Sequence, residues 1–363
     1  MDLERRLELI TRIPTEEVIT PNELRVLLET EEHPIAYDGF EPSGLAHLPF
    51  GILRSVKIQD LLEAGCRFKL LLADWHAMIN NKMGGDLERI RKVGEYLVEV
   101  WKASGVDMNR VEVIWASDVA SNEEYWRTVV SVLKHVTLKR VTRCLTIMGR
   151  REGEMKEAAQ FLYPAMQVAD IFHLNVDICQ LGLDQRRANI LAREVSVKMG
   201  QRRPVAVHHH MLMGLQGPVE LKGYDEQKEL DAQISWKMSK SLPETSIFVH
   251  DSKEDITRKI RSAYCPPKEV KGNPILEYCK YIVFMLKPSL RVERSAKYGG
   301  AVEYSGYEEL EKDFREGRLH PLDLKNAVIE VLEEIVRPTR EHFEKDPRAK
   351  DLYSFVKEQE VTR

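Results

Sequence analysis

Hydrophobic runs of strand length alternate with amphipathic segments from near residue 35 to near residue 207, and this alternation predicts an α/β fold. The run over 68–75 is almost unbroken, as is typical of parallel strands buried on both faces. After Asp86, a suitable helix N-cap, hydrophobic residues recur at helical spacing as far as Ser104. Further strands are predicted near residues 35–37, 111–115, 176–179 and 204–207. Strands that alternate with helices form a doubly wound parallel sheet, whose ligands lie beyond the carboxyl ends of the strands.

The helical pattern predicts the remaining organisation. Further helices are expected over residues 23–29, 52–62, 122–150, 154–173 and 185–199. From about residue 246 the strand pattern fades, and helices are predicted over 254–264, 274–286, 307–315 and 322–343. We therefore expect a helical N-terminal lead-in over residues 1–33, an α/β domain over 34–245 with a helical insertion, and an all-helical domain over 246–363.

One strand-to-helix connection has the features of an anion-binding site. A predicted strand ends near Tyr37, a turn rich in glycine and proline follows, and a helix begins near Pro49. The free N–H groups and the dipole of a helix N-terminus favour phosphate, and Pro49 suits the first turn because it has no N–H to leave unpaired. The alternative is a plain connection between a strand and a helix.

A second segment, about two hundred residues later, favours the phosphate interpretation. Residues 236–243 read Trp-Lys-Met-Ser-Lys-Ser-Leu-Pro, so two lysines and two serines stand within five residues. A loop of this kind can close on a polyphosphate, although in isolation it would be interpreted as an exposed basic linker. The chain contains no G-x-x-x-x-G-K-[ST] and no G-x-G-x-x-G motif, which argues against a P-loop ATPase and a dinucleotide oxidoreductase.

Composition narrows the class of protein. The chain has 363 residues, of which 43% are hydrophobic, enough for a large core. It has no apolar run of about eighteen residues and no signal-peptide pattern, so we expect a cytoplasmic protein that does not bind a membrane. The net charge of −4 argues against a generally basic nucleic-acid coat, and any RNA contact would come from local basic patches. Charged residues make up 31% of the chain, a feature of thermophilic proteins.

Cysteines and histidines give no convincing metal site. The five cysteines show no C-x-x-C spacing, which favours buried thiols over disulfides or zinc ligands. Residues 208–210 are three consecutive histidines, but adjacent side chains on an extended segment point to alternate sides. A structural or nucleotide-lining role is therefore favoured over metal binding, and no metal held by the protein is predicted.

The two phosphate-binding segments together resemble the two signatures of class I aminoacyl-tRNA synthetases, usually written HIGH and KMSKS. Over nearly the whole chain, the sequence is similar to tyrosyl-tRNA synthetases of the archaeal and eukaryotic kind. The motifs that match are YDGFEPSG at 37–44, LADWHA at 72–77, YPAMQVAD at 163–170, DQRR at 184–187 and HPLDLK at 320–325. The resemblance implies a Rossmann-like catalytic domain over 34–245 and a helical anticodon-binding domain over 246–363.

By this resemblance, the chain joins L-tyrosine to tRNA(Tyr) through a tyrosyl-adenylate, with release of AMP and pyrophosphate. The phenol hydroxyl of tyrosine would lie between Tyr37 and Asp170, a pairing that makes chemical sense because a phenol both donates and accepts a hydrogen bond. Without that hydroxyl, both buried groups would lose a partner, so phenylalanine would be rejected; the discrimination by tyrosyl-tRNA synthetase is a known example. The family positions around the substrate ammonium correspond to Tyr163, Gln167 and Gln185.

The resemblance also implies an ATP site. Its residues would be Gly39, Glu41, Gly44, His47, Lys237, Ser239 and Lys240. Of these, His47, Lys237 and Lys240 would be catalytic. His47 would donate a hydrogen bond to the phosphates, and the two lysine ammonium groups would neutralise the charge that develops on them. Mg²⁺ would accompany ATP and pyrophosphate. The chain departs from the family at Pro49 and Phe50, where HIGH has glycine and a second histidine. Phe50 cannot hydrogen-bond a phosphate, so that role is lost or moved to another residue.

For tRNA, the resemblance places Arg143, Arg186 and Arg187 near the acceptor end. Tyr298, His320 and Asp323 match positions that contact the anticodon, where Tyr298 would stack on a base and Asp323 would accept a hydrogen bond from guanine. Solvated helix faces are the alternative for the arginines. The family analogy also predicts a homodimer.

Three other functions are compatible with parts of the sequence. A tryptophanyl-tRNA synthetase shares the fold and both signatures, but Tyr37 and Asp170 suit a phenol better than an indole with its single N–H donor. A nonenzymatic RNA-binding protein on the same scaffold is opposed by the intact lysines of the KMSKS segment, although the altered Phe50 is compatible with it. A small-molecule nucleotidyltransferase is opposed by the C-terminal helical domain with its motif at 320–325.

Overall fold

The computed structural model describes residues 1–149, 157–218 and 235–359. The chain forms two compact units, each of which is described by itself. The first unit contains Met1–Gly44, Val56–His210 and Leu352–Arg363, and the second contains Leu45–Ser55 and Met211–Asp351. The domain boundaries expected after residues 33 and 245 stay predictions. The end near Arg150 and the start near Glu154 that were expected for two helices fall outside the described residues.

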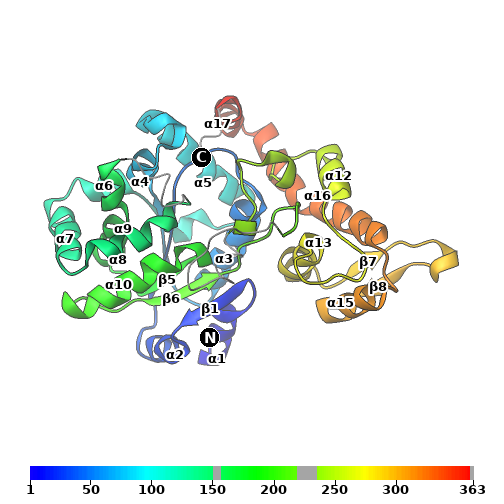
Figure 1. Ribbon diagram of the computed structural model, residues 1–363, viewed down its shortest axis with the longest axis horizontal. Coiled ribbons are helices and arrows are strands. Elements are labelled where there is room, and N and C mark those ends of the chain that lie inside the picture. The colour runs from blue at the N-terminus through cyan, green and yellow to red at the C-terminus, as the bar shows by residue number, and fades with distance from the viewer. Residues whose placement is uncertain (150–156, 219–234, 360–363) are drawn as a thin grey trace. The chain divides into compact units, whose positions relative to one another are not determined.

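A six-stranded sheet is the centre of the first unit (Figure 1). Its strands are β1 (Thr15–Ile19), β2 (Ile35–Phe40), β3 (Arg67–Leu72), β4 (Val111–Trp115), β5 (Ile178–Gly182) and β6 (Val205–His209). The order across the sheet is β1-β6-β5-β2-β3-β4, with β2 to β6 parallel and β1 antiparallel to β6. The order therefore reverses between β2 and β5, which is the position where doubly wound sheets bind ligands. The predicted fold class is confirmed.

Helices cover this sheet because their apolar faces need a partner. The helices of the first unit are α1 (Leu3–Thr11), α2 (Pro21–Thr30), α4 (Asp74–Ile79), α5 (Leu87–Ala103), α6 (Ala116–Ala120), α7 (Glu123–Lys134), α8 (Leu138–Cys144), α9 (Tyr163–His173) and α10 (Arg186–Lys198). Helix α9 packs between α7 and α10, and buried side chains from all three join those of β2 and β5 in one core. Helix α5 begins at the predicted cap, since Asp86 accepts hydrogen bonds from the N–H groups of Glu88 and Arg89.

Two expectations for this unit were wrong. The lead-in over residues 1–33 is not entirely helical, because β1 lies between α1 and α2. The helix expected over 122–150 is interrupted after Lys134, and α8 begins anew with Thr137 as its N-cap, whose hydroxyl accepts from the N–H of Arg140 at 3.2 Å. A threonine side chain that competes for a backbone N–H favours such a restart.

The second unit is mainly helical (Figure 1). It contains the π-helical turns η1 (Pro49–Leu53) and η9 (Cys279–Val283), and the helices α12 (Lys253–Ser262), α13 (Pro274–Tyr278), α14 (Phe284–Leu286), α15 (Tyr307–Glu316) and α16 (Pro321–Lys345). Helix α12 packs on α16. A short antiparallel pair, β7 (Leu290–Val292) with β8 (Val302–Tyr304), was not predicted, because three residues are too few to show a period.

Two helices contain a boundary between the units: α3 (Arg54–Glu63) and α17 (Pro347–Glu358) each begin in the second unit and end in the first. Within the described ranges, none of the helices combines the length and the apolar character that crossing a membrane would require.

Candidate active site

Strand β2 and helix α9 present two sets of polar residues within the first unit. On β2, Tyr37 and Gly39 are two residues apart, and Glu41 follows directly after the strand, so all three share one face. On α9, Tyr163, Gln167 and Asp170 are spaced by four and three residues, which puts them on one side of the helix. Strand β2 borders the point where the strand order reverses, so these residues belong to the expected ligand edge of the sheet.

Asp170 is a buried carboxylate with a polar neighbour at each oxygen. Its side chain is 1% exposed, the Tyr125 hydroxyl donates to its Oδ1 at 2.9 Å, and His76 Nε2 lies 3.2 Å from its Oδ2. Burial lowers the pKa of His76, but the nearby carboxylates of Asp170, Glu41 and Asp74 together outweigh burial, so the pKa is raised above its usual value. Burial and the same carboxylate raise the pKa of Tyr125. Both shifts favour the protonated forms of Tyr125 and His76 beside this carboxylate.

Gly39 allows the Tyr37 ring to lie along the backbone of β2. A Cβ atom at position 39 would stand 3.1 Å from the Tyr37 hydroxyl, closer than almost all real contacts of this kind. Tyr37 itself is buried. A side chain at 39 would require the phenol to shift by a few tenths of an ångström, so the glycine helps to set the position of the Tyr37 ring.

Glu41 lies among residues assigned to the amino acid. The Tyr163 hydroxyl donates to its Oε1 at 2.7 Å, and Asn80 Nδ2 donates to both of its oxygens at 2.9 and 3.0 Å. Burial and the Glu41 charge raise the pKa of Tyr163 well above its usual value, so the phenol stays a donor. The His76 ring meets the Tyr163 ring edge to face at 4.8 Å. The expected ATP contact of Glu41 stays a prediction.

Two glutamines form the rest of this group. Gln167 Nε2 donates to Gln185 Oε1 at 3.3 Å, and Gln185 Nε2 donates to the carbonyl of Ile147 at 3.1 Å. The Gln167 Oε1 atom is buried and has no hydrogen-bond partner among the described residues. A buried acceptor without a donor costs free energy, and an ammonium group would satisfy it.

In the second unit, the two signature segments lie close together. His47 pairs with Phe248 in an antiparallel bridge, a few residues after the KMSKS segment. Burial, with the charges of Lys240 and Lys237 among other causes, lowers the pKa of His47 well below its usual value. His47 is therefore neutral near pH 7, and its Nδ1 is a buried atom without a hydrogen-bond partner in the part of the chain that the structure describes.

Phe50 faces two cations from its place in the altered signature. The Lys240 ammonium lies 5.4 Å from the centre of its ring, and the Arg54 guanidinium lies 6.0 Å from it. The ring is buried. These distances fall in the range of cation–π attraction. Phe50 therefore contacts the second lysine of KMSKS, which the sequence did not predict.

Other signature residues have local roles. Gly44 has a φ of +110°, a conformation that side chains rarely adopt. Pro49 occupies the first turn of η1, as expected. The Ser239 and Ser241 hydroxyls lie 2.8 Å apart, so one donates to the other.

The arginines expected at the acceptor end differ in their surroundings. Arg143 is exposed on α8. Arg187 donates to the Thr146 hydroxyl at 2.7 Å, and Arg186 forms an ion pair with Glu17 of β1 at 2.9 Å. An RNA contact by Arg186 would compete with this ion pair.

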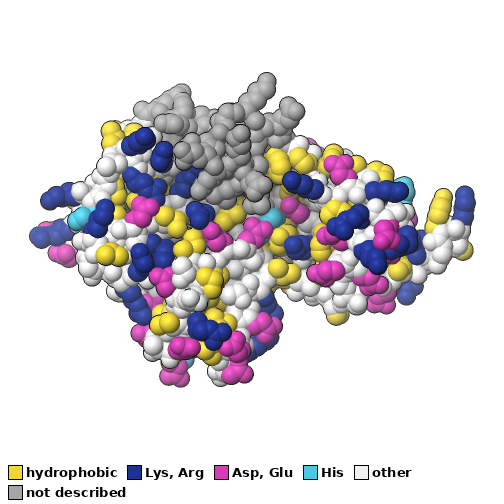
Figure 2. Space-filling view, turned by 60° about the horizontal axis from the view of Figure 1, so that its bottom comes forward, with side chains coloured by type: hydrophobic (Ala, Val, Ile, Leu, Met, Phe, Trp, Pro, Cys, Tyr) yellow, Lys and Arg dark blue, Asp and Glu magenta, His cyan; other side chains and the backbone are white. Residues whose placement is uncertain are grey.

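The residues expected at the anticodon lie in the second unit. Tyr298 is 64% exposed in the connection between β7 and β8, as a stacking platform must be. His320 is the N-cap of α16, where its Nδ1 accepts from the N–H of Leu322 at 3.2 Å, and Asp323 follows in the first turn. On the face shown in Figure 2, basic and acidic side chains are intermixed rather than gathered into one basic surface.

The three consecutive histidines bond to different partners. His208 Nδ1 lies 2.8 Å from Glu17, His209 Nδ1 lies 3.0 Å from the Gln180 amide, and His210 Nδ1 lies 2.5 Å from Glu16. No group of three or more residues suited to a metal ion occurs among the residues that the structure describes.

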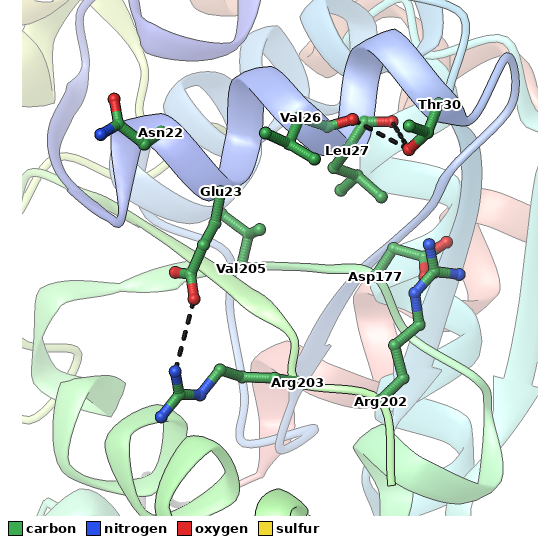
Figure 3. Close-up of a pocket in the computed structure, with 9 residues that line it drawn as sticks. All are labelled: Asn22, Glu23, Val26, Leu27, Thr30, Asp177, Arg202, Arg203 and Val205. Carbon is green, nitrogen blue, oxygen red and sulfur yellow. Dashed lines mark hydrogen bonds and ion pairs between the residues drawn. The ribbon is translucent and has the colours of Figure 1, made fainter.

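A hollow of about 360 Å³ lies at the opposite edge of the sheet (Figure 3). Asp177 directly precedes β5, and Val205 begins β6, so this hollow is at the amino ends of the strands. Its charged groups pair with one another, Arg202 with Asp177 at 2.6 Å and Arg203 with Glu23 at 3.5 Å. Because these charged groups already pair with one another, they do not indicate a ligand site. The hollow also lies away from the carboxyl ends of the strands, where such sheets bind ligands.

Sequence reasoning missed three polar residues of the site. Tyr125 and Asn80 stand in segments read only as helix or connection, and nothing in their spacing singles them out. Nothing in the sequence placed His76 beside Asp170. Its place in the LADWHA motif is the one signal that pointed to it.

Comparisons with known proteins agree on the family. A family model described as "tRNA synthetases class I (W and Y)" matches residues 29–221 and 228–337. A tyrosine–tRNA ligase of Thermococcus sibiricus is 46% identical, and the alignment covers 100% of both chains. The cytoplasmic tyrosine–tRNA ligase 1 of Arabidopsis thaliana is 44% identical, over 100% of this chain and 90% of the relative.

A solved structure extends the likeness to three dimensions. The crystal structure of tyrosyl-tRNA synthetase from Pyrococcus horikoshii in complex with L-tyrosine has a TM-score of 0.90 and 44% identity, and the match covers 98% of this chain and 100% of that one. The fold, the signature segments and the full-length identity all indicate the same family. The chain belongs to the class I tRNA synthetases of the tryptophan and tyrosine family.

Proposed function

We propose that the chain is a tyrosine–tRNA ligase, which activates L-tyrosine with ATP and transfers it to tRNA(Tyr). The observation that carries the choice of tyrosine is the pair of a buried phenol, Tyr37, which can donate a hydrogen bond, and a buried carboxylate, Asp170, which can accept one. Tryptophan, the other substrate class in the family, presents an N–H that can only donate, whereas a phenol can also accept. The relatives that match over the full length are named tyrosine–tRNA ligases.

For the amino acid, Tyr37 and Asp170 would bind the phenol hydroxyl, and Tyr163, Gln167 and Gln185 would surround the ammonium group. The unpartnered Gln167 Oε1 supports this assignment, since it is an acceptor that a bound ammonium would satisfy. The carboxylate of tyrosine is ionised at neutral pH, so no general base is needed for its attack on the α-phosphate.

For ATP, the proposed contacts are Gly39, Glu41, Gly44, His47, Lys237, Ser239 and Lys240. Lys237 and Lys240 would stabilise negative charge as pyrophosphate leaves, and ATP and pyrophosphate would carry Mg²⁺ as part of the substrate and product. His47 is neutral because of burial and the lysine charges, and a neutral imidazole can donate one N–H to a phosphate oxygen. Catalysis then consists mainly of positioning and electrostatic stabilisation.

For tRNA, Arg143, Arg186 and Arg187 would contact the acceptor end, and Tyr298, His320 and Asp323 the anticodon. The exposure of Tyr298 and of Arg143 supports these assignments. We also propose a homodimer in the cytoplasm. Large apolar side chains that are exposed on and beside α7, Val130 at 55% and Leu138 at 72%, suit a surface that a second copy covers. The Arabidopsis relative is named as cytoplasmic.

The test is exchange of labelled pyrophosphate into ATP without tRNA, measured in parallel with tyrosine, phenylalanine and tryptophan. We expect exchange with tyrosine alone, because only tyrosine satisfies both Tyr37 and Asp170. Exchange with tryptophan would overturn the assignment of these two residues. No exchange with any of the three would overturn the enzymatic function.

A further inference from the structure

The two signature segments of the second unit are joined through a shared strip, residues 246–251. On one side, the N–H of Leu48 donates to the carbonyl of Ile247 at 2.9 Å, and the N–H of Val249 donates to the carbonyl of Ala46 at 3.0 Å. These bonds place His47 opposite Phe248. The strip therefore fixes the backbone on both sides of His47.

On its other side, the strip meets the KMSKS segment. The Ser246 hydroxyl donates to the carbonyl of Ser239 at 2.7 Å, between Lys237 and Lys240. Ser246 is fully buried, so this bond does not compete with water. One short stretch of chain is thus bonded to both sets of residues proposed for the ATP phosphates.

Lys259 of α12 binds this strip through two hydrogen bonds and a contact with an aromatic ring. Its ammonium donates to the carbonyl of Ser246 at 2.9 Å and to Asp251 Oδ2 at 2.7 Å, and it lies 5.0 Å from the centre of the Phe248 ring. The same Asp251 oxygen accepts from the N–H of Phe248 at 2.9 Å. Lys259 is 4% exposed. A buried ammonium is costly unless it is paired, and here its partners are parts of the strip itself.

We propose that Lys259 is a positioning residue, which sets the KMSKS segment in register with His47 by fixing residues 246–251. This inference rests on the proposed function, and it assigns to α12 a part in tyrosine activation. Lys259 acts through Ser246 and Phe248 and touches no substrate. Its loss should lower the rate of activation more than it weakens binding of tyrosine, since every residue proposed for the tyrosine side chain belongs to the first unit.

The experiment compares Lys259→Met with Lys253→Met in pyrophosphate exchange. Methionine keeps most of the length of the stem and removes the ammonium. We expect kcat to fall about tenfold or more for Lys259→Met, while the Kd for labelled tyrosine in equilibrium dialysis without ATP stays within about twofold. Lys253 lies on the same helix in an exposed pair with Glu330, so its variant should match the wild type in both measurements.

Ser246→Ala provides a second and milder variant, because it removes the bond to Ser239 without a change in charge. We expect kcat to fall about two- to tenfold, while the midpoint of thermal unfolding falls by no more than about 4 °C, so the enzyme remains folded in the assay. Wild-type kcat in a folded Lys259→Met enzyme would overturn the inference, and if that variant does not fold, wild-type kcat in Ser246→Ala would do so. Absence of exchange in the wild type would overturn the proposed function and this inference with it.

Discussion

At the scale of single residues, Phe50 is the clearest departure from the family signature. Its ring lies 5.4 Å from the Lys240 ammonium and 6.0 Å from the Arg54 guanidinium. A histidine at this position could donate a hydrogen bond to a phosphate, whereas phenylalanine can only attract cations to its face. In this chain, the position therefore contacts the lysine that is proposed to bind ATP.

This change leads to a prediction for Phe50→Met. Methionine fills a similar volume without an aromatic face, so the Lys240 ammonium loses about 0.5–2 kcal/mol of attraction. We expect kcat/KM for ATP in pyrophosphate exchange to fall about 2- to 30-fold. Phe50→Tyr retains the ring face and should remain close to the wild type. If both variants lose activity equally, packing rather than the ring face explains the effect.

Single residues also show what the sequence could and could not predict. Tyr37 and Asp170 stand in recognisable motifs, and the structure buries both. Tyr125 is 45 positions from its partner Asp170, in a segment whose pattern indicates only a buried helix face. A hydrogen bond across that separation depends on how α7 packs on α9, and a hydrophobic pattern carries no information about that packing.

At the scale of elements, β1 shows why an edge strand was missed. Its sequence, Thr-Glu-Glu-Val-Ile, has two adjacent carboxylates and no alternation of apolar and polar residues. The strand forms because it pairs with β6 and because both carboxylates bond to histidines in or directly after β6. Glu16 bonds to His210, and Glu17 bonds to His208. The parallel strands were predicted near their observed positions, since most of their residues are apolar.

The pairing of β1 predicts sensitivity to acid. Burial alone would raise the pKa of Glu17, but hydrogen bonds from His208 and Arg186 outweigh it and lower the pKa to about 2. A carboxyl whose folded pKa is depressed stabilises the fold above its unfolded pKa, near 4.5, and this contribution disappears as the pH falls toward 2. Because about a third of the side chain is exposed, we expect a contribution of about 1–2 kcal/mol.

Urea unfolding of Glu17→Gln at several pH values between 2 and 7 would measure this contribution. We expect the variant to be less stable than the wild type at pH 7, with a difference that shrinks below pH 4.5. Glu29→Gln, on the exposed face of the neighbouring α2, is the control and should follow the wild type throughout. A difference for Glu17→Gln that does not change with pH would contradict the assigned role of its charge.

At the scale of the whole molecule, the proposed functions are divided between the two units. The residues proposed for the tyrosine side chain lie in the first unit, whereas the KMSKS lysines and the proposed anticodon residues lie in the second. The proposed activation of tyrosine uses residues of both units and needs no tRNA, whereas the proposed anticodon residues belong to the second unit alone and have no part in activation. Variants at the anticodon residues should therefore affect only the reaction that includes tRNA.

Asp323→Ala tests this separation most directly. A carboxylate that accepts a hydrogen bond from guanine contributes about 1.5–3 kcal/mol, so kcat/KM for tRNA(Tyr) in aminoacylation should fall about 10- to 100-fold. Pyrophosphate exchange without tRNA should stay at the wild-type rate. Asp323 also lies in the first turn of α16, where any acidic residue favours the helix dipole. Glu308→Ala removes one of the two first-turn carboxylates of α15 and should leave both reactions unchanged. Equal loss in the two Ala variants would mean that the helix dipole, rather than contact with a base, accounts for the effect of Asp323.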